Sequence, residues 1–286
     1  MVLAEVNARV GSRYRWQRQL VGGEQSGAHL VVEDDRLAVL KWEPAGWKAA
    51  QLLRAFPAVL HATDRGWPAA RWLAAGPLTG GGAFVLQQHI EGTPMSEWDI
   101  DTVRAVIAAN ARQSGLGSGH APDDSGQLEA VLSGDHAWKA HVAGFTAAGA
   151  VLVEHGDEIV AWAGRAVIPG SDVVHGDYSS SNILLDPHGS TAIFVDCQTI
   201  GRGSRIRDLA DLYRQSFVYP SPGNTGSSLL RTAATAAEGP KVFAKCAVAV
   251  TYNNLAWWVE NKPPAEFDEA CARLHRLFDD LRHQPS

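Results

Sequence analysis

The sequence lacks the features that define several large protein classes. Its three cysteines, Cys197, Cys246 and Cys271, are odd in number and widely spaced, which fits neither a disulfide framework nor a zinc site. There is no basic run, and 25 Lys and Arg against 31 Asp and Glu give a formal charge of -6. Such a chain cannot neutralise a series of phosphates. We therefore expect buried, reduced thiols and no nucleic-acid partner.

Long apolar segments and an export signal are also missing. The longest stretch free of charged residues, 72–90, is interrupted by Pro77 and several glycines, so it does not suit a membrane-spanning helix. The N-terminus lacks the basic-then-apolar order of a secretory signal. We expect a cytoplasmic protein without a membrane partner.

Several catalytic motifs are absent as well. The chain has no Gly-Lys dipeptide, which excludes a Walker A loop. It also has no G-x-G-x-x-G, G-x-S-x-G or His-Glu-x-x-His motif. These absences exclude the common phosphate-binding loops, the nucleophile-elbow hydrolases and the zinc proteases that carry such motifs.

One segment carries a clear chemical pattern. A His-Gly-Asp triplet ending at Asp177 is followed by Asn182, and an apolar segment over 183–195 ends at Asp196. The turn residues Asp-Pro-His-Gly-Ser divide that segment into two short strands, so an antiparallel hairpin would return Asp196 to the end where Asn182 lies. Amide and carboxylate oxygens at one place suit Mg²⁺, and a further carboxylate suits a base that takes a hydroxyl proton. These three side chains predict a phosphoryl-transfer centre.

This pattern resembles the aminoglycoside phosphotransferase family of antibiotic kinases, relatives of the protein kinases in which His-Gly-Asp replaces His-Arg-Asp. The resemblance implies that Asp177 is the base and that Asn182 and Asp196 hold the metal. His175, the second candidate catalytic residue, would then support the loop by hydrogen bonding, and the alternative is that His175 is itself the base. The resemblance extends to Asp208, which would cap a helix and brace the catalytic loop.

The chain departs from the family pattern at one point. The family usually has Gly-Asp-Pro where this chain has Gly203-Ser204-Arg205. The local geometry beyond the metal site is therefore left open.

The resemblance implies an α+β, protein-kinase-like fold of two lobes. Residues 1–90 would form a nucleotide-binding lobe with an antiparallel sheet and a helix, and residues 91–286 a mainly helical catalytic and substrate-binding lobe with the catalytic β-hairpin. Local patterns predict strands over 14–21, 29–32, 36–42, 69–75 and 83–87. They predict a helix that starts near Ser96 and includes 103–110, and further helices over 47–56, 128–132, 136–147, 152–165, 208–217, 241–260 and 267–281.

A glycine-rich segment lies between the first two expected strands. In a kinase this is the place of the loop that covers the ATP phosphates, because glycine lets backbone amides approach them closely. Gly23, Ser26 and Gly27 are therefore candidate nucleotide contacts. An ordinary flexible hairpin is the alternative.

Lys41, at the end of an apolar strand, is the candidate phosphate-binding lysine, and a lysine pointing into solvent is the alternative. In protein kinases the equivalent lysine pairs with a glutamate of the next helix. That glutamate is missing here, because the expected helix 47–56 contains no acidic residue. Gln88, His89 and Ile90 match the position of the family's hinge, whose backbone would bond the adenine.

Acidic residues near the C-terminus are candidates for binding a cationic acceptor. Glu260 and Asp268 lie in a segment where acidic residues outnumber basic ones, and Asp135 forms a second candidate patch with His136 and Trp138. A solvated acidic face is the alternative for both.

The resemblance implies an ATP-dependent O-phosphotransferase that uses Mg²⁺, with GTP left open as the donor. The acceptor would be a small, hydroxylated, cationic antibiotic, either an aminoglycoside or a tuberactinomycin peptide such as capreomycin or viomycin, and its modification would confer resistance. A small-metabolite kinase for choline, homoserine or an aminosugar is the alternative, and a non-catalytic pseudokinase is a third possibility. We expect a monomer or a weak dimer.

Overall fold

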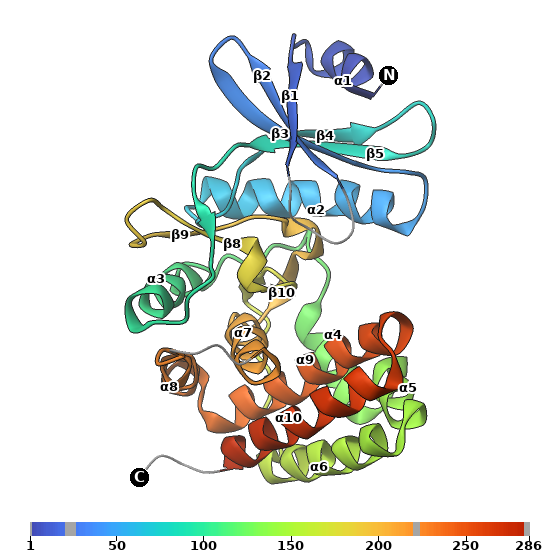
Figure 1. Ribbon diagram of the computed structural model, residues 1–286, viewed down its shortest axis with the longest axis vertical. Helices are drawn as coiled ribbons and strands as arrows, with labels where there is room; N and C mark the ends of the chain where they lie inside the picture. The colour runs from blue at the N-terminus through green and yellow to red at the C-terminus, as the bar shows by residue number, and fades with distance from the viewer. Residues whose placement is uncertain (1, 21–26, 220–223, 283–286) are drawn as a thin grey trace.

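A computed structural model describes residues 2–20, 27–219 and 224–282 of the chain. Two lobes are stacked along the long axis, with a sheet and two helices in the upper one and a helical bundle in the lower one (Figure 1). This is the expected kinase-like α+β architecture.

The upper lobe is built on a five-stranded antiparallel sheet with the order β1-β2-β3-β5-β4. Successive side chains along each strand point to opposite faces of this sheet. Leu40 and Phe84 pack with Leu3 and Val6 of the first helix, whereas Val39 joins Ala28 in a separate small cluster. The elements are α1 (Val2–Val10), β1 (Arg15–Leu20), β2 (Ala28–Glu33), β3 (Arg36–Glu43), α2 (Trp47–Asp64), β4 (Trp72–Pro77) and β5 (Ala83–Gln88).

The helix of this lobe is longer than predicted. α2 continues to Asp64 although Pro57 lies inside it. A proline removes one helical hydrogen bond, which favoured an end at residue 56. Beyond it, however, Ala58, Val59 and Ala62 are all buried at helical spacing, and this packing keeps the segment helical.

The catalytic hairpin joins the two lobes. β8 (Ile183–Leu185) and β9 (Ala192–Phe194) pair in antiparallel register, and β6 (Thr93–Pro94) flanks β8. The amide of Ala70 donates to the carbonyl of Phe194, and the amide of Phe194 donates to the carbonyl of Pro68. β7 (Asp172–Val174) and β10 (Gly201–Gly203) form a second small antiparallel pair.

The lower lobe is organised around two buried helices, α7 and α9. Twelve of the thirteen residues of α7 are buried, as is α9 from Val242 to Tyr252. The helices are α3 (Ile100–Ala111), α4 (Asp124–Ser133), α5 (Ala137–Phe145), α6 (Ala147–Ala163), α7 (Ile206–Val218), α8 (Ser227–Glu238), α9 (Pro240–Asn261) and α10 (Pro264–Arg282). Neither α1 nor α8 was predicted.

Two sequence expectations concern membranes and thiols. In the described ranges, no helix combines the length and apolarity needed to cross a bilayer. Cys197, Cys246 and Cys271 are all buried and free.

Candidate active site

The loop between β7 and β8 brings Asp177 and Asn182 into direct contact. The Asn182 side-chain amide donates to the backbone carbonyl of Asp177 and to its Oδ2, both at 3.0 Å. Residues Ser180–Asn182 form a single 3-10 turn, and the Asn182 amide donates to the Ser179 carbonyl at 2.9 Å. The five-residue spacing is thus closed by hydrogen bonds into one compact unit.

The hairpin returns Asp196 to that unit. The amide of Val195 donates to the carbonyl of Asn182 at 2.9 Å, so the residue after Val195 lies beside Asn182. Asp196 has a φ of 63°, in the left-handed region that non-glycine residues seldom occupy. Such strain is found where a side chain must be aimed at a functional site. The oxygen-bearing side chains of Asp177, Asn182 and Asp196 therefore converge.

Lys41 reaches the same place from the upper lobe. Its Nζ lies 2.9 Å from Oδ1 of Asp196, and the lysine side chain is only 14% exposed. A lysine pointing into solvent is therefore excluded. The missing helical glutamate is replaced by an ion pair with a candidate metal ligand of the other lobe.

His175 is held in one tautomer. Its Nε2 donates to the carbonyl of Val195 at 2.8 Å, since a carbonyl can only accept. Its Nδ1 accepts from the amide of Asp177 at 3.3 Å, since an amide can only donate. Both ring nitrogens are thus engaged with the backbone, which suits support of the loop and not proton transfer.

The glycine between these two residues is required by the backbone. Gly176 has a φ of 84°, and a Cβ there would lie 2.3 Å from the carbonyl oxygen of Thr199. Any side chain would push apart the loop and the segment after Asp196. Close packing at this point therefore explains the central glycine of the His-Gly-Asp triplet.

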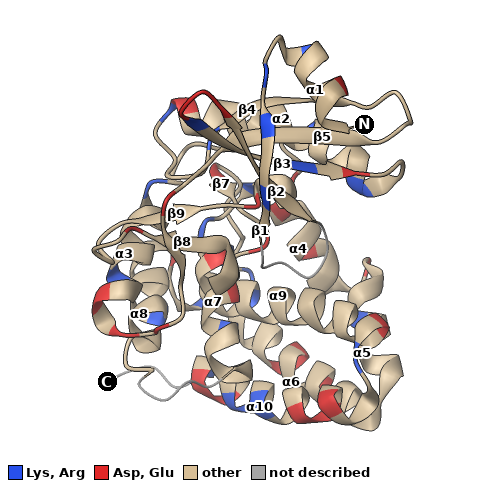
Figure 2. Cartoon of the chain, turned by 45° about the horizontal axis from the view of Figure 1, so that its top comes forward, with Lys and Arg blue, Asp and Glu red and all other residues tan. Residues whose placement is uncertain are grey.

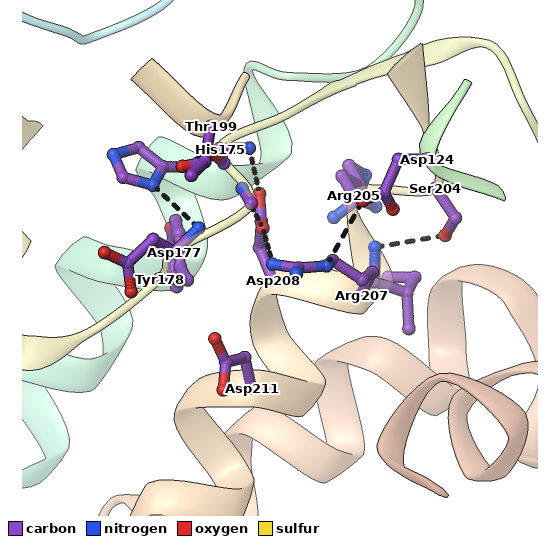
Figure 3. Close-up of polar contacts among 12 residues, drawn as sticks. Asp124, His175, Asp177, Tyr178, Thr199, Ser204, Arg205, Arg207, Asp208 and Asp211 are labelled. Carbon is purple, nitrogen blue, oxygen red and sulfur yellow. Dashed lines mark hydrogen bonds and ion pairs between the residues drawn. The ribbon is translucent and has the colours of Figure 1, made fainter. Parts of the chain in front are cut away.

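Asp208 lies beneath the loop and is fully buried (Figure 3). Its carboxylate accepts from the amides of His175 at 2.8 Å and Gly176 at 3.2 Å, and from the side chain of Gln113 at 2.7 Å. The expectation that Asp208 caps the helix is wrong, because α7 already begins at Ile206. Ser204 Oγ, not Asp208, accepts from the Ile206 amide.

The departure at Gly203-Ser204-Arg205 is compensated by carboxylates from elsewhere. Ser204 is buried, and its hydroxyl donates to Oε2 of Glu238 at 2.6 Å. The amide of Arg205 donates to Oδ2 of Asp172 at 3.2 Å. Together, α8 and β7 supply acidic partners for a segment in which the family's own aspartate is missing.

Partial desolvation and like charges make Asp177 more basic than an ordinary aspartate. Although it is exposed, neighbouring protein atoms partly desolvate its carboxylate and raise its pKa. The nearby carboxylates of Asp211 and Asp196 raise it further, and Arg207 opposes them. A raised pKa favours uptake of a proton from a hydroxyl.

A buried charge cluster extends from the loop into the lower lobe (Figure 3). Arg207 is 3% exposed and lies 3.4 Å from Asp208 Oδ1 and 3.6 Å from Asp124 Oδ1. Burial raises the pKa of Asp124 to about 6, although Arg207 lowers it. Asp211 is paired with Arg214 at 2.7 Å.

Sequence reasoning missed two α7 side chains that face the catalytic loop. Asp211 lies near Asp177, and Gln215 hydrogen-bonds the loop backbone. The signal was available, because both follow Asp208 at intervals of three and seven residues, the spacing of one helical face. Asp172 and Glu238 could not be found this way, since their partners are distant in the sequence.

A family model for the "Phosphotransferase enzyme family" matches residues 17–244. The chain belongs to this phosphotransferase family. No curated protein matches the sequence. Among solved structures, a thermostable aminoglycoside phosphotransferase APH(4)-Ia mutant in complex with AMP-PNP and hygromycin B is similar, with a TM-score of 0.72 at 14% identity over 98% of each chain. APH(3'')-Id from Streptomyces rimosus, in complex with ADP and streptomycin, gives 0.55 at 20% identity over 86% of this chain and 96% of that one.

Other nucleotide contacts expected of this phosphotransferase stay predictions. Gly23 and Ser26 lie outside the described residues, whereas Gly27 is exposed just before β2. Gln88 ends β5 with its side chain exposed, and His89 and Ile90 follow it half-buried on the way to the lower lobe.

The acceptor candidates of the phosphotransferase are exposed: Glu260 at the end of α9, Asp268 in α10 and Asp135 before α5. Figure 2 shows acidic residues on α6 and both acidic and basic residues on α10. Several acidic groups there are already paired, including Glu269 with Arg273 and Glu158 with Arg282. Binding of an acceptor by the three candidates stays a prediction.

Proposed function

We propose that this phosphotransferase moves the γ-phosphoryl group of ATP to a hydroxyl of a small molecule, with Mg²⁺ as the metal. The observation that carries the proposal is the grouping of Asp177, Asn182 and Asp196, with Lys41 ion-paired to Asp196. Positioning and charge stabilisation supply most of the catalysis in phosphoryl transfer, and these four groups are the kind it requires. GTP stays open as an alternative donor.

The donor set fits a hard cation. Asn182 and Asp196 offer an amide and a carboxylate oxygen side by side, and Mg²⁺ prefers such ligands while keeping several waters. When bound, the ion neutralises charge on the phosphates. Lys41 would then exchange its bond with Asp196 for a phosphate oxygen. Asp177 would orient the acceptor hydroxyl and take its proton, with His175 and Asp208 holding the loop.

The lobes divide these tasks in the proposal. Residues 1–90 would bind the nucleotide, with Gly23, Ser26 and Gly27 over the phosphates. Residues 91–286 would supply the base and the acceptor surface. We propose that the protein acts as a monomer or weak dimer in the cytoplasm, where ATP is available.

We propose a cationic antibiotic as the acceptor, either an aminoglycoside or a tuberactinomycin peptide such as capreomycin or viomycin, so that transfer confers resistance. The similar solved proteins in complex with hygromycin B and streptomycin support this class. Exposed Glu260, Asp268 and Asp135 would attract such a cation. The existing ion pairs on α10 favour the alternative, a kinase for a smaller metabolite such as choline, homoserine or an aminosugar.

Mass spectrometry tests donor and acceptor together. The protein is incubated with Mg²⁺, ATP and a panel of antibiotics and metabolite alcohols, and each compound is examined for the mass of one added phosphoryl group. We expect a modified antibiotic with the wild-type protein and none with Asp177→Asn. Modification of metabolites alone would overturn the antibiotic assignment.

A further inference from the structure

A second side chain of α7, Gln215, hydrogen-bonds the catalytic loop and lies two helical turns beyond Asp208. Gln215 is only 6% exposed. Its Oε1 accepts from the amide of Ser180 at 3.2 Å, and its Nε2 donates to the carbonyl of Tyr178 at 3.0 Å. One side-chain amide therefore pairs with the two backbone groups that flank Ser179, much as a neighbouring strand would.

These two bonds act at the midpoint between the base and the metal ligand. The amide of Ser179 donates to the carbonyl of Asp177, and the carbonyl of Ser179 accepts from the amide of Asn182, both at 2.9 Å. The segment that Gln215 holds is thus hydrogen-bonded to Asp177 on one side and to Asn182 on the other. A shift of this segment would move both residues.

The two anchors come from one rigid element. Asp208 holds the amides of His175 and Gly176, and Gln215 holds the loop after Asp177. Asp177 therefore lies between two fixed points on a helix that is buried along nearly its whole length. Reactions that depend on positioning are sensitive to displacements of about 1 Å.

We propose that Gln215 is a positioning residue for phosphoryl transfer, whose amide fixes residues 178–180 and thereby the placement of Asp177 relative to Asn182. The proposal rests on the proposed function, because it assigns Gln215 to the same reaction. Gln215 touches neither nucleotide nor acceptor in this scheme and acts only through the loop.

Two substitutions separate the parts of this contact. Gln215→Met keeps the approximate size of the side chain and removes both hydrogen bonds. Gln215→Glu keeps an acceptor for the Ser180 amide but replaces the donor to Tyr178 with an oxygen. Ser216→Ala is the matched control, since Ser216 is equally buried and its hydroxyl donates to the carbonyl of Tyr213 in its own helix.

The experiment combines hydrogen exchange at the Ser180 amide with steady-state kinetics of Mg-ATP turnover, with water or an identified alcohol as acceptor. We expect Gln215→Met to speed exchange at Ser180 by about tenfold or more. It should lower kcat by about 10–100-fold, while KM for ATP stays within about threefold. The kcat of Gln215→Glu should lie between those of Gln215→Met and the wild type. Ser216→Ala should match the wild type in both Ser180 exchange and kcat.

The proposal is overturned if Gln215→Met shows the same Ser180 exchange rate and the same kcat as Ser216→Ala. If the methionine variant does not fold, an unchanged kcat in Gln215→Glu would overturn it instead, because that variant keeps the acceptor for the Ser180 amide and loses the bond to Tyr178. A wild-type protein that neither binds nor turns over Mg-ATP would count against the proposed function. Ser180 exchange would still report whether Gln215 holds the loop.

Discussion

Asp177 is the residue on which the proposed chemistry depends, and its surroundings determine when it can act. It must be ionised to take a proton, and partial desolvation by neighbouring protein atoms raises its pKa. Asp211 and Asp196 add like charge that raises this pKa further. The same features that make it a better base therefore limit its activity at low pH.

Replacing Asp177 with Asn removes the base and keeps the shape of the side chain. We expect kcat to fall by about 10²–10⁴-fold, with little change in nucleotide affinity. Steady-state kinetics and calorimetric ATP binding measure the two effects separately. Asp101→Asn, an exposed helix position, is the control. Nearly full turnover by Asp177→Asn would refute the role of the base.

The pH dependence of the wild type tests the environment of Asp177. Because its pKa is raised, activity should decline toward acid at a higher pH than an unperturbed aspartate would give. Asp211→Asn removes a like charge and should move this acid limb to lower pH. A profile of kcat/KM against pH measures the shift. An acid limb that stays in place would show that Asp211 does not act on Asp177.

At the scale of elements, the catalytic hairpin was predictable and its supports were not. Turn residues and short apolar runs between 183 and 195 are local signals, and they predicted the strands that return Asp196 to Asn182. The Lys41–Asp196 pair and the Ser204–Glu238 bond join distant segments, so no local pattern indicates them. α2 passed through Pro57 because burial outweighed the lost hydrogen bond.

Helices α6 and α10 are joined by a histidine pair. The Nδ1 atoms of His155 and His275 lie 3.1 Å apart, with ring centroids 5.4 Å apart and planes at 17°. At that centroid separation, so short a distance requires the two nitrogens to face one another. One must carry a hydrogen and the other must not, so full protonation breaks the bond.

This pair predicts a loss of stability in mild acid. Burial and the neighbouring His155 lower the pKa of His275 in the folded protein. The unfolded chain therefore binds the proton more readily, and stability falls as the pH drops through the ordinary histidine range, near about 6.5. Because of this pair, we expect the midpoint of thermal unfolding to fall by about 2 °C or more between neutral and mildly acidic pH.

His275→Leu should weaken that pH dependence, whereas His141→Asn, at an exposed position on α5, should not. Thermal unfolding followed by circular dichroism at several pH values measures the difference. Identical pH dependence in wild type and His275→Leu would contradict the role of the pair.

At the scale of the whole molecule, the two lobes meet where the chemistry is proposed. Lys41 of the upper lobe pairs with Asp196 of the lower one, and residues 68–70 bond β9. The family pattern predicted the lobes and the convergence of the loop residues, since that pattern lies within one segment. Which lobe would supply a partner for Lys41 could be learned only from the structure.

Calorimetric titration of ATP, with and without Mg²⁺, into the wild type and Asp196→Asn tests this convergence most directly. We predict Mg²⁺-dependent binding by the wild type and by the Asp101→Asn control, and binding weakened by about 10–100-fold or more in Asp196→Asn. Unchanged Mg-ATP affinity in Asp196→Asn would contradict the convergence of Lys41, Asn182 and Asp196 on one metal-bound nucleotide.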